Sequence, residues 1–471
     1  MILTPERTFS SNRTHGKRRL VLISLDWTRP KDPPLSLGHA SIVTHMKRLD
    51  LDVVPGSWSV TNPNFRIEQV LQFITENTRD QTDIGIGAFV WNESYVLQII
   101  SRLKQSQFPG RIILGGSQIS YTKENLESYY PEADIFVRGY AEQALAELYQ
   151  SSELNPTITG IHYAGEPDLG VSAVSDLEKL DSPYLSGTLK PQNFVRWETQ
   201  RGCPFRCAFC QHRESDTSQV KRVFNKDRIV QEIDFFLANS QVRDISVLDP
   251  VFNTGPNYLA ILKRFAEGRY TGKLSLQCRL EMVTTEFLEL VDEINSTGRV
   301  VLEFGLQTIH RKEERHIQRP NNMNIVRDVF EQTHIRGINT EVSLIFGLPD
   351  QTVASFQQSI DFCKSMKVPT IYAYPLRLHR GTPLYEKKEL LRLVESDHNC
   401  FQDDGELIGH VIASPSFSKE DWYRMADMAL QLDEYNARRG LKMSQTLKNT
   451  MWNSSGSTEI GTVTDPIITS V

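Results

Sequence analysis

Three cysteines lie within eight residues of one another, at Cys203, Cys207 and Cys210, in a C-x3-C-x2-C spacing. Three thiolates on one loop can bind three irons of a cubane [4Fe–4S] cluster, which leaves the fourth iron open to another ligand. A structural zinc site is the alternative, and His212 is then the nearby fourth ligand. The residues favour the cluster, because a closed zinc site needs a fourth protein ligand at zinc spacing and His212 is the only nearby candidate.

The other cysteines are scattered, which is unlike a disulfide framework. Cys278 and Cys363 lie in apolar stretches and are expected to be small buried hydrophobic residues. Cys400 follows Asn399, and its role stays open between an extra ligand, a radical quencher and neither.

Short apolar runs alternate with segments of helical period over residues 19–150, after a polar tail at 1–18. This alternation predicts a Rossmann-like, doubly wound α/β domain, whose ligands bind where loops leave the carboxyl ends of the strands. The expected strands are 20–25, 51–54, 84–90, 111–114 and 135–137, with helices near 38–49, 65–78, 93–106 and 142–150.

Residues 151–193 are rich in Pro, Ser, Gly and Asp and are expected to form a linker. Six further strand–helix units over 194–390 predict a partial (β/α)6, TIM-like barrel with its chemistry at the carboxyl ends of the strands. The cysteines follow the first of these strands. Residues 391–440 are expected to form a small helical region that covers the open side of the barrel, and 441–471 a polar tail.

The overall composition indicates a cytoplasmic enzyme that acts on a small molecule. Net charge is −6, from 52 Lys and Arg against 58 Asp and Glu, and no dense basic block favours nucleic acid. No apolar run approaches the roughly 18 residues of a membrane span, and the basic opening precedes too short an apolar run for a secretory signal.

The cysteine spacing, together with the aromatic Phe209 before the last cysteine, resembles the signature of the radical S-adenosylmethionine (SAM) superfamily. The resemblance implies that the open iron binds SAM through its amino and carboxylate groups. One electron then cleaves a C–S bond of SAM, so the resemblance also implies an electron donor such as flavodoxin or ferredoxin.

Four later stretches are similar to further motifs of the superfamily: 247–253, 302–308, 343–350 and 374–384. The chain departs from those motifs at Gln307 and Asp350, where relatives carry Glu, and at Ser343, where they carry Gly. From the residues alone, these positions could equally be strand ends, helix caps or turns. The resemblance assigns cofactor binding to Phe209, Asp249, Glu303, Gln307, Ser343, Gly347 and Arg377.

The order of an N-terminal doubly wound domain, a linker and a radical barrel is similar to the cobalamin-binding subfamily. That resemblance implies corrin contacts from three loops, at Trp91, Asn92, Gly115, Gly116, Ser117, Gly139 and Glu142. No D-x-H-x-x-G element occurs, so cobalamin is expected without a lower histidine ligand. A first domain that holds no corrin is the alternative.

The expected reaction is therefore cobalamin-dependent transfer of a methyl or related alkyl group to a small metabolite or natural-product intermediate. Without cobalamin, the same radical could drive cyclisation, dehydration, epimerisation or transfer of a 3-amino-3-carboxypropyl group from SAM. The alternative outside catalysis is a metal-binding scaffold, which would need a fourth protein ligand and would not cleave SAM.

Overall fold

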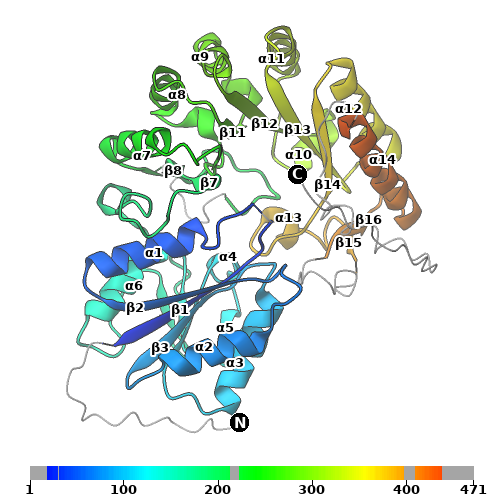
Figure 1. The fold of residues 1–471 in the computed structure, drawn as a ribbon. Helices are drawn as coiled ribbons and strands as arrows, with labels where there is room; N and C mark the ends of the chain where they lie inside the picture. The colour runs from blue at the N-terminus through cyan, green and yellow to red at the C-terminus, as the bar shows by residue number, and fades with distance from the viewer. Residues whose placement is uncertain (1–17, 30, 213–221, 397–408, 438–471) are drawn as a thin grey trace, which may run out of the picture.

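The computed structural model describes residues 18–29, 31–212, 222–396 and 409–437. Within these ranges, the chain forms two α/β domains (Figure 1). Residues 1–17 and 441–471 of the two predicted tails, and Cys400, fall outside them.

The first domain is built on a six-stranded sheet in the order β2-β1-β3-β4-β5-β6. The first five strands are parallel, as predicted, and the strand order reverses between β1 and β3. In such sheets the crevice at this reversal is where ligands bind. The strands are β1 (Arg19–Asp26), β2 (Asp52–Ser59), β3 (Thr82–Gly87), β4 (Ile112–Gly115), β5 (Ile135–Val137) and β6 (Ile161–Tyr163).

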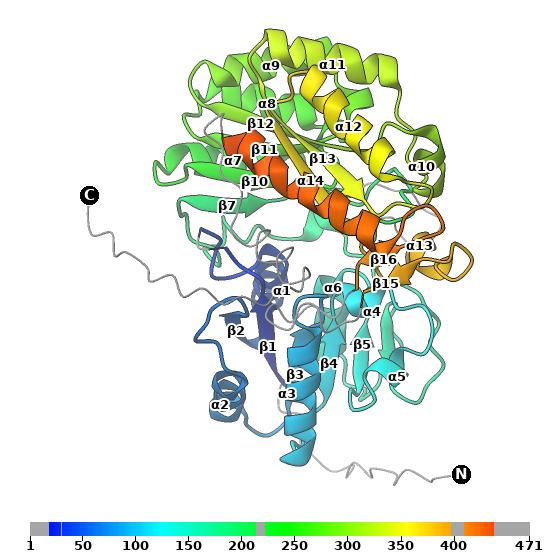
Figure 2. The same cartoon turned by 90° about the vertical axis from the view of Figure 1, so that its right-hand side faces the viewer.

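Helices cover both faces of this sheet, which confirms the doubly wound prediction (Figure 2). One apolar cluster lies under α2 (Ile67–Asn77) and α3 (Glu93–Gln105), and another lies under α1 (Leu37–Arg48) and α6 (Ala141–Gln150). Buried β-branched residues fill the middle strands, as expected when a parallel sheet is covered on both faces. The short helices α4 (Ser117–Ser120) and α5 (Leu126–Tyr129) lie between β4 and β5.

Part of the predicted linker belongs to the first sheet. β6 pairs antiparallel with β5, so residues 161–163 form an edge strand rather than a free connection. Gly160, just before it, has φ +85°, and a Cβ there would lie 2.3 Å from the backbone nitrogen of Ala173. The segment therefore folds back closely on its own later residues.

The second domain contains six parallel strands in the order β14-β13-β12-β11-β10-β7, and β14 and β7 are the two edges of this sheet. The sheet is therefore the predicted partial barrel, open between its first and last strands. Its strands are β7 (Phe194–Trp197), β10 (Asp244–Val247), β11 (Lys273–Cys278), β12 (Arg299–Gln307), β13 (Asn339–Phe346) and β14 (Thr370–Pro375).

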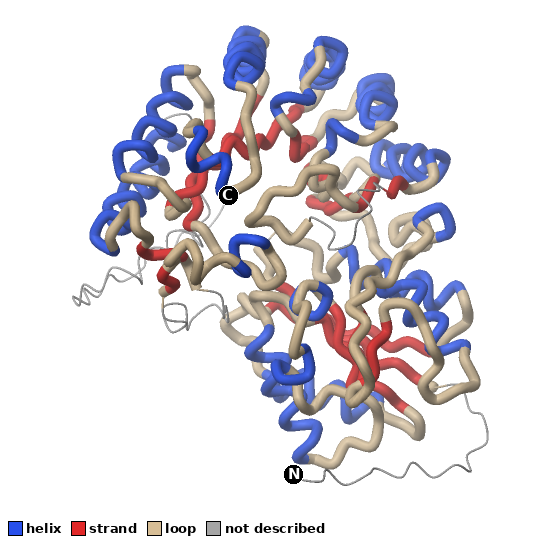
Figure 3. Tube along the Cα trace, turned by 180° about the vertical axis from the view of Figure 1, so that it is seen from behind, coloured by secondary structure: helices blue, strands red, loops and turns tan. Residues whose placement is uncertain are grey.

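Helices form a layer outside this sheet, as seen from behind in Figure 3. The layer consists of α7 (Lys226–Ala238), α8 (Tyr258–Glu267), α9 (Thr285–Asn295), α11 (Met323–Ile335) and α12 (Val353–Ser365). Alternate strand residues such as Phe304 pack against these helices, here against Phe330 of α11. The remaining strand residues face the inside of the barrel.

The C-terminal region extends the outer helix layer. Its helix α14 (Lys419–Ala437) packs against α12 and the edge strand β14, and Asn436 exchanges two hydrogen bonds with the backbone of Ile371. We expected this region to cover the open side of the barrel. Its described helix lies against the outside instead, because its apolar residues complete the core beside α12. A short antiparallel pair, β15 (Val394–Glu395) and β16 (Val411–Ala413), precedes it.

Candidate functional site

The three cysteines lie on the loop that follows β7, at the carboxyl end of the barrel. The backbone of Ala208, inside this loop, is held from two sides, because it accepts from the N–H of Leu384 at 3.0 Å and donates to Ile317 O at 2.7 Å. Cys207 is buried, and Cys203 and Cys210 are half-buried. The loop is thus fixed by segments that follow β12 and β14 and lie more than a hundred residues away in the sequence.

Burial makes two of the three thiols harder to ionise. It raises the pKa of Cys210 to about 11 and also raises the pKa of Cys203, although a backbone hydrogen bond at each thiol and the charge of Arg319 oppose the shift. Thiols in such a site ionise when a cation binds them.

The cysteine geometry differs from that of a site for a single metal ion. Within the described parts of the chain, no three His, Cys, Asp or Glu side chains converge on one point that could hold such an ion. A cubane cluster does not require convergence, because each thiolate binds a different iron. The donor set and its spacing therefore fit a cluster better than zinc.

Arg319 connects the cysteine loop to β12. Its guanidinium donates to Cys207 Sγ at 3.5 Å and, through Nε, to Gly305 O at 3.0 Å. Gln307 lies beside this pair, since a Cβ on Gly305 would come within 2.5 Å of its Nε2. Its Oε1 is buried and has no hydrogen-bond partner among the described residues. An acceptor of this kind can take a hydrogen bond from an ammonium group of a ligand.

Asp249, two residues after β10, binds the segment that precedes the cysteine loop. Its carboxylate accepts hydrogen bonds from the backbone N–H of Thr199 at 2.7 Å and of Gln200 at 3.2 Å, and from the Thr199 hydroxyl. Burial raises the pKa of Asp249 to about 7, although these hydrogen bonds oppose that shift. Both carboxylate oxygens thus contact the segment that leads to the cysteines.

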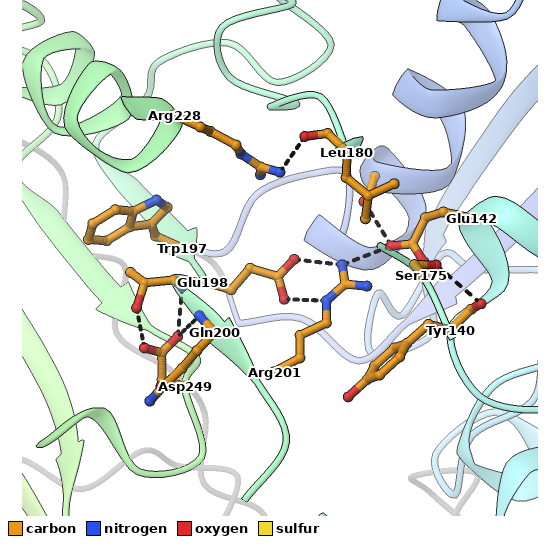
Figure 4. Close-up of polar contacts among 12 residues, drawn as sticks. Tyr140, Glu142, Ser175, Leu180, Trp197, Glu198, Gln200, Arg201, Arg228 and Asp249 are labelled. Atoms are coloured by element: carbon orange, nitrogen blue, oxygen red, sulfur yellow. Dashed lines mark hydrogen bonds and ion pairs between the residues drawn. The ribbon is translucent and has the colours of Figure 1, made fainter. Parts of the chain in front are cut away.

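Arg201 connects the same segment to the first domain. Its guanidinium pairs with Glu198 at 2.7 Å and with Glu142 of α6 at 2.8 Å (Figure 4). Ser41 and Ser175 donate to the two oxygens of Glu142, at 2.9 and 3.1 Å. Burial alone would raise the pKa of Glu142, but Arg201 and these hydrogen bonds hold it at about 2.

Trp91 and Asn92, both predicted to contact a corrin, tie together the two loops at the strand-order reversal. Each donates from its side chain to Leu25 O, at 3.0 and 2.9 Å. Asn92 is fully buried, and its amide oxygen accepts from the backbone of Phe89. The half-buried Trp91 ring stacks on Phe89 at 4.7 Å between centroids, and this leaves a flat aromatic pair at the edge.

The predicted glycines produce close backbone contacts at the same edge. Gly116 and Gly139 have φ +91° and +78°, and a Cβ on either would come within 2.5 Å of a backbone oxygen, of Ala88 or Ala173. Gly115 has more room, because the nearest atom to a Cβ there is Val137 O at 3.7 Å. Ser117 begins α4 directly after them.

Glu303 points into the barrel from the middle of β12, opposite Glu341 on β13. No hydrogen bond or ion pair joins either carboxyl to the described residues. Burial raises the pKa of Glu303 to about 7, and the nearby Glu341 adds to that shift. Tyr374 and Gln277 are exposed on the same inner face, so a solute can reach it.

The remaining predicted positions lie within or after barrel strands, or on the cysteine loop. Ser343 is opposite Gly305 on the inner face. Arg377 follows β14, and its backbone forms an isolated β-bridge with that of His410. Gly347 donates to Gln351 Oε1 at 2.7 Å, which favours a role in a turn. Phe209 packs against the barrel core. The ligand-binding roles of all these residues stay predictions.

Residues 197–363 match the family model described as the radical SAM superfamily. Residues 197–363 form a radical SAM domain. The matched region starts in β7 and contains the cysteine loop, Asp249, Arg319 and Gln307, so it covers the barrel part of the site, whereas Glu142 and the edge of the first domain lie outside it.

Two curated relatives of this radical SAM chain are methyltransferases. One is 2-(S-pantetheinyl)-carbapenam-3-carboxylate methyltransferase of Streptantibioticus cattleyicolor, 23% identical over 404 residues, covering 78% of this chain and 59% of the relative. The other is the cobalamin-dependent radical SAM methyltransferase TokK of Streptomyces tokunonensis, 24% identical over 330 residues, covering 65% and 48%. The chain thus spans about half the length of these relatives.

The fold is also that of a solved radical SAM methyltransferase, TsrM from Kitasatospora setae, whose structure has cobalamin and a [4Fe–4S] cluster bound. The TM-score is 0.69 over 91% of both chains, at 15% identity. This likeness confirms the predicted order of the two domains. Among the residues that the structure describes, no helix is both long and apolar enough to cross a membrane.

Three residues of the radical SAM site were not predicted from the sequence. Arg319 is 112 positions from Cys207, and no spacing rule joins them. Glu341 lies on an ordinary strand, but a charged residue facing the inside of a barrel was a usable signal. Arg201 directly precedes the Gly202-Cys203 step, yet its partner Glu142 appeared only as a predicted corrin contact.

Proposed function

We propose that this chain is a cobalamin-dependent radical SAM methyltransferase that acts on a small molecule. The observation that carries the proposal is a contact between the two domains. Glu142, at the edge of the first domain where strand loops gather, pairs with Arg201, which leads into the cysteine loop. An enzyme that uses two cofactors on one substrate needs both of their sites to face the same space.

The cysteine loop fits a [4Fe–4S] cluster with one open iron. Cys203, Cys207 and Cys210 would hold three irons, and Arg319 would donate to the sulfur of Cys207 as it does here. The unpartnered amide oxygen of Gln307, near Arg319, fits the amino group of SAM. These assignments rest on the donor set and on that orphaned acceptor.

The edge of the first domain fits a flat macrocycle. It presents the stacked rings of Phe89 and Trp91, the side-chain-free backbone at Gly115, and Gln118, whose buried Oε1 has no partner among the described residues. The edge loops 26–38, 89–94, 115–120 and 139–142 contain no histidine. We therefore expect the corrin to bind without a lower imidazole.

When bound, the cofactors supply the electron that cleaves SAM and the cobalt that carries the methyl group. The chain's own residues position these groups and exclude water. Asp249 and Arg201 fix the base of the cysteine loop, and the inner face of the barrel offers Glu303, Glu341 and Tyr374 to a substrate. The enzyme also needs a reductant, for which flavodoxin or ferredoxin is our expectation.

Anaerobic reconstitution tests the proposal. The full chain is loaded with iron, sulfide and hydroxocobalamin, and metal and corrin contents are measured before incubation with SAM and dithionite. We expect about four irons and one corrin per chain, followed by 5′-deoxyadenosine. The Cys207→Ala variant serves as the control and should form neither cluster nor product.

Two results would contradict the proposal. Iron and 5′-deoxyadenosine without corrin would indicate a cobalamin-free radical enzyme. Zinc in place of iron, with no cleavage of SAM, would indicate a metal-binding scaffold.

A further inference from the structure

Arg201 is the point where the cysteine loop meets the first domain. Only 8% of its side chain is exposed, and its guanidinium pairs with carboxylates from two domains. Glu198 comes from the barrel, three residues earlier, and Glu142 comes from the first turn of α6. The rings of Tyr140 and Phe224 lie 4.9 and 5.4 Å from the guanidinium carbon and shield it from water.

Glu142 is itself held in one position by the first domain. Ser41 of α1 and Ser175 of the connecting segment donate to its two oxygens. The side chains of Arg201, Glu142, Ser41 and Ser175 are all buried. Water therefore cannot replace either partner of the Arg201–Glu142 ion pair without leaving a buried charge unpaired. The position of Arg201 is therefore set jointly by Glu198 of the barrel and by Glu142 of the first domain.

Only one residue separates Arg201 from Cys203, so the position of Arg201 constrains where Cys203 lies. Gly202 follows with φ +86°, and Cys203 is the next residue. On the other side, Asp249 holds Thr199 and Gln200. Cys203 thus follows a segment, residues 199–202, that is anchored to the barrel through Asp249 and to the first domain through Glu142.

We propose that Arg201 and Glu142 are positioning residues through which the first domain sets the place of Cys203 relative to Cys207 and Cys210. The pair then controls the geometry of the cluster and how well its open iron receives SAM. This inference goes beyond the proposed function, because it holds whether or not the first domain carries a corrin.

The test compares two interdomain ion pairs in the full-length protein. Glu142→Gln removes the charge that holds Arg201 but keeps the shape of the side chain. Glu93→Gln is the matched control, because Glu93 pairs with Arg380 across the domains at 2.6 Å and is not bonded to the cysteine segment 199–210. Both variants are reconstituted with iron and sulfide, without corrin.

The readouts are the electron paramagnetic resonance spectrum of the reduced cluster, with and without SAM, and the affinity for SAM. We expect Glu142→Gln to retain its fold by circular dichroism, to shift the cluster spectrum, and to weaken SAM binding roughly tenfold, the scale of one lost charge-assisted hydrogen bond. Glu93→Gln should keep the wild-type spectrum and affinity. Arg201→Lys should resemble Glu142→Gln, because an ammonium cannot reproduce the two-carboxylate fork.

The proposal is overturned if Glu142→Gln and Arg201→Lys show the wild-type spectrum and affinity, or if Glu93→Gln changes both as much as they do. The second result would mean that any loosened domain contact disturbs the cluster. Failure of the proposed function looks different, because wild-type protein would then take up zinc or cleave no SAM.

Discussion

Two pairs of acidic residues in this molecule, one buried and one half-buried, have opposite surroundings. Asp249 and Glu142, which flank the base of the cysteine loop, each accept hydrogen bonds at both carboxylate oxygens. Glu303 and Glu341, half-buried on the inner face of the barrel, face each other, and neither carboxyl has a hydrogen bond or ion pair with the described residues. The sequence alone does not distinguish the two pairs, because all four residues are acids that follow or belong to apolar segments.

The difference indicates what each pair does. A buried carboxylate with all its partners stabilises the local structure that supplies them. A buried carboxyl without partners costs free energy, and folds retain such groups mainly at functional sites. We therefore interpret the first pair as support for the cysteine loop and the second as a surface available to a ligand.

The largest expected effect tests the loop that the first pair supports. Cys207→Ala should reduce iron from about four atoms per chain to nearly none, because a cubane with only two protein thiolates is not retained. Cys278→Ala, which changes a buried cysteine of the barrel core, is the matched control and should bind iron like the wild type. Equal iron loss in both variants would contradict the assignment of the triad.

Removing the supported acid itself should have the next largest effect. Asp249→Ala leaves two backbone N–H groups and a hydroxyl without an acceptor, and this should lower the free energy of unfolding by about 3 kcal/mol. Thermal unfolding measures the loss, and iron uptake should fall with it. Glu341→Ala, which removes an acid without partners, should cost much less. A larger loss for Glu341→Ala would reverse the comparison.

Ionisation of the unpartnered Glu303 should weaken the fold. The pKa of Glu303 is raised to about 7 in the folded chain, above its ordinary value of 4.5. Folded stability is therefore lost as pH rises through this interval, and Glu303→Gln avoids that loss. We expect the variant to match the wild type near pH 4 and to be more stable by about 2 kcal/mol near pH 8.

Melting temperatures across pH measure this difference. The exposed Glu289 of α9 provides the control, since Glu289→Gln relieves no buried charge. A stability gain for Glu303→Gln that does not depend on pH would show that ionisation is not its cause.

The smallest expected effect lies where the two regions meet. The guanidinium of Arg319 places a positive charge beside the sulfur of Cys207 and donates a hydrogen bond to the backbone oxygen of Gly305. Arg319→Met should shift the midpoint potential of the cluster to more negative values, because a nearby cation favours the reduced cluster. Arg311→Met, on the exposed start of α10 (Arg311–His316), should leave the potential unchanged. An equal shift in both variants would exclude a local effect.

The sequence predicted the scaffold well for a physical reason. Strands of a covered parallel sheet are continuous apolar runs, so the five expected strands of the first domain were found within a few residues of their predicted places, and the six expected barrel strands lie within 194–390. The cysteine loop was equally readable, because its ligands are local in the chain. The edge strand β6 was harder to predict, since three residues carry little periodic signal.

The partners of the predicted site residues could not be read from sequence, because they depend on long-range packing. Asp249 is predicted to contact a cofactor, and the structure adds that its oxygens contact Thr199 and Gln200. Glu142 is predicted to contact a corrin, and the structure adds that it pairs with Arg201. A motif gives the residue type and the strand end, whereas the direction of the side chain follows from which segments fold against it.

We propose that the cysteine loop and the edge of the first domain that would bind the corrin face the same space. Pulsed electron paramagnetic resonance of reduced, corrin-loaded protein tests this directly, because the cobalt and the cluster can both carry an unpaired electron. We predict a dipolar coupling between the two spins that Cys207→Ala removes. Two uncoupled spectra from protein that contains both cofactors would contradict the account, because the corrin would then be bound elsewhere.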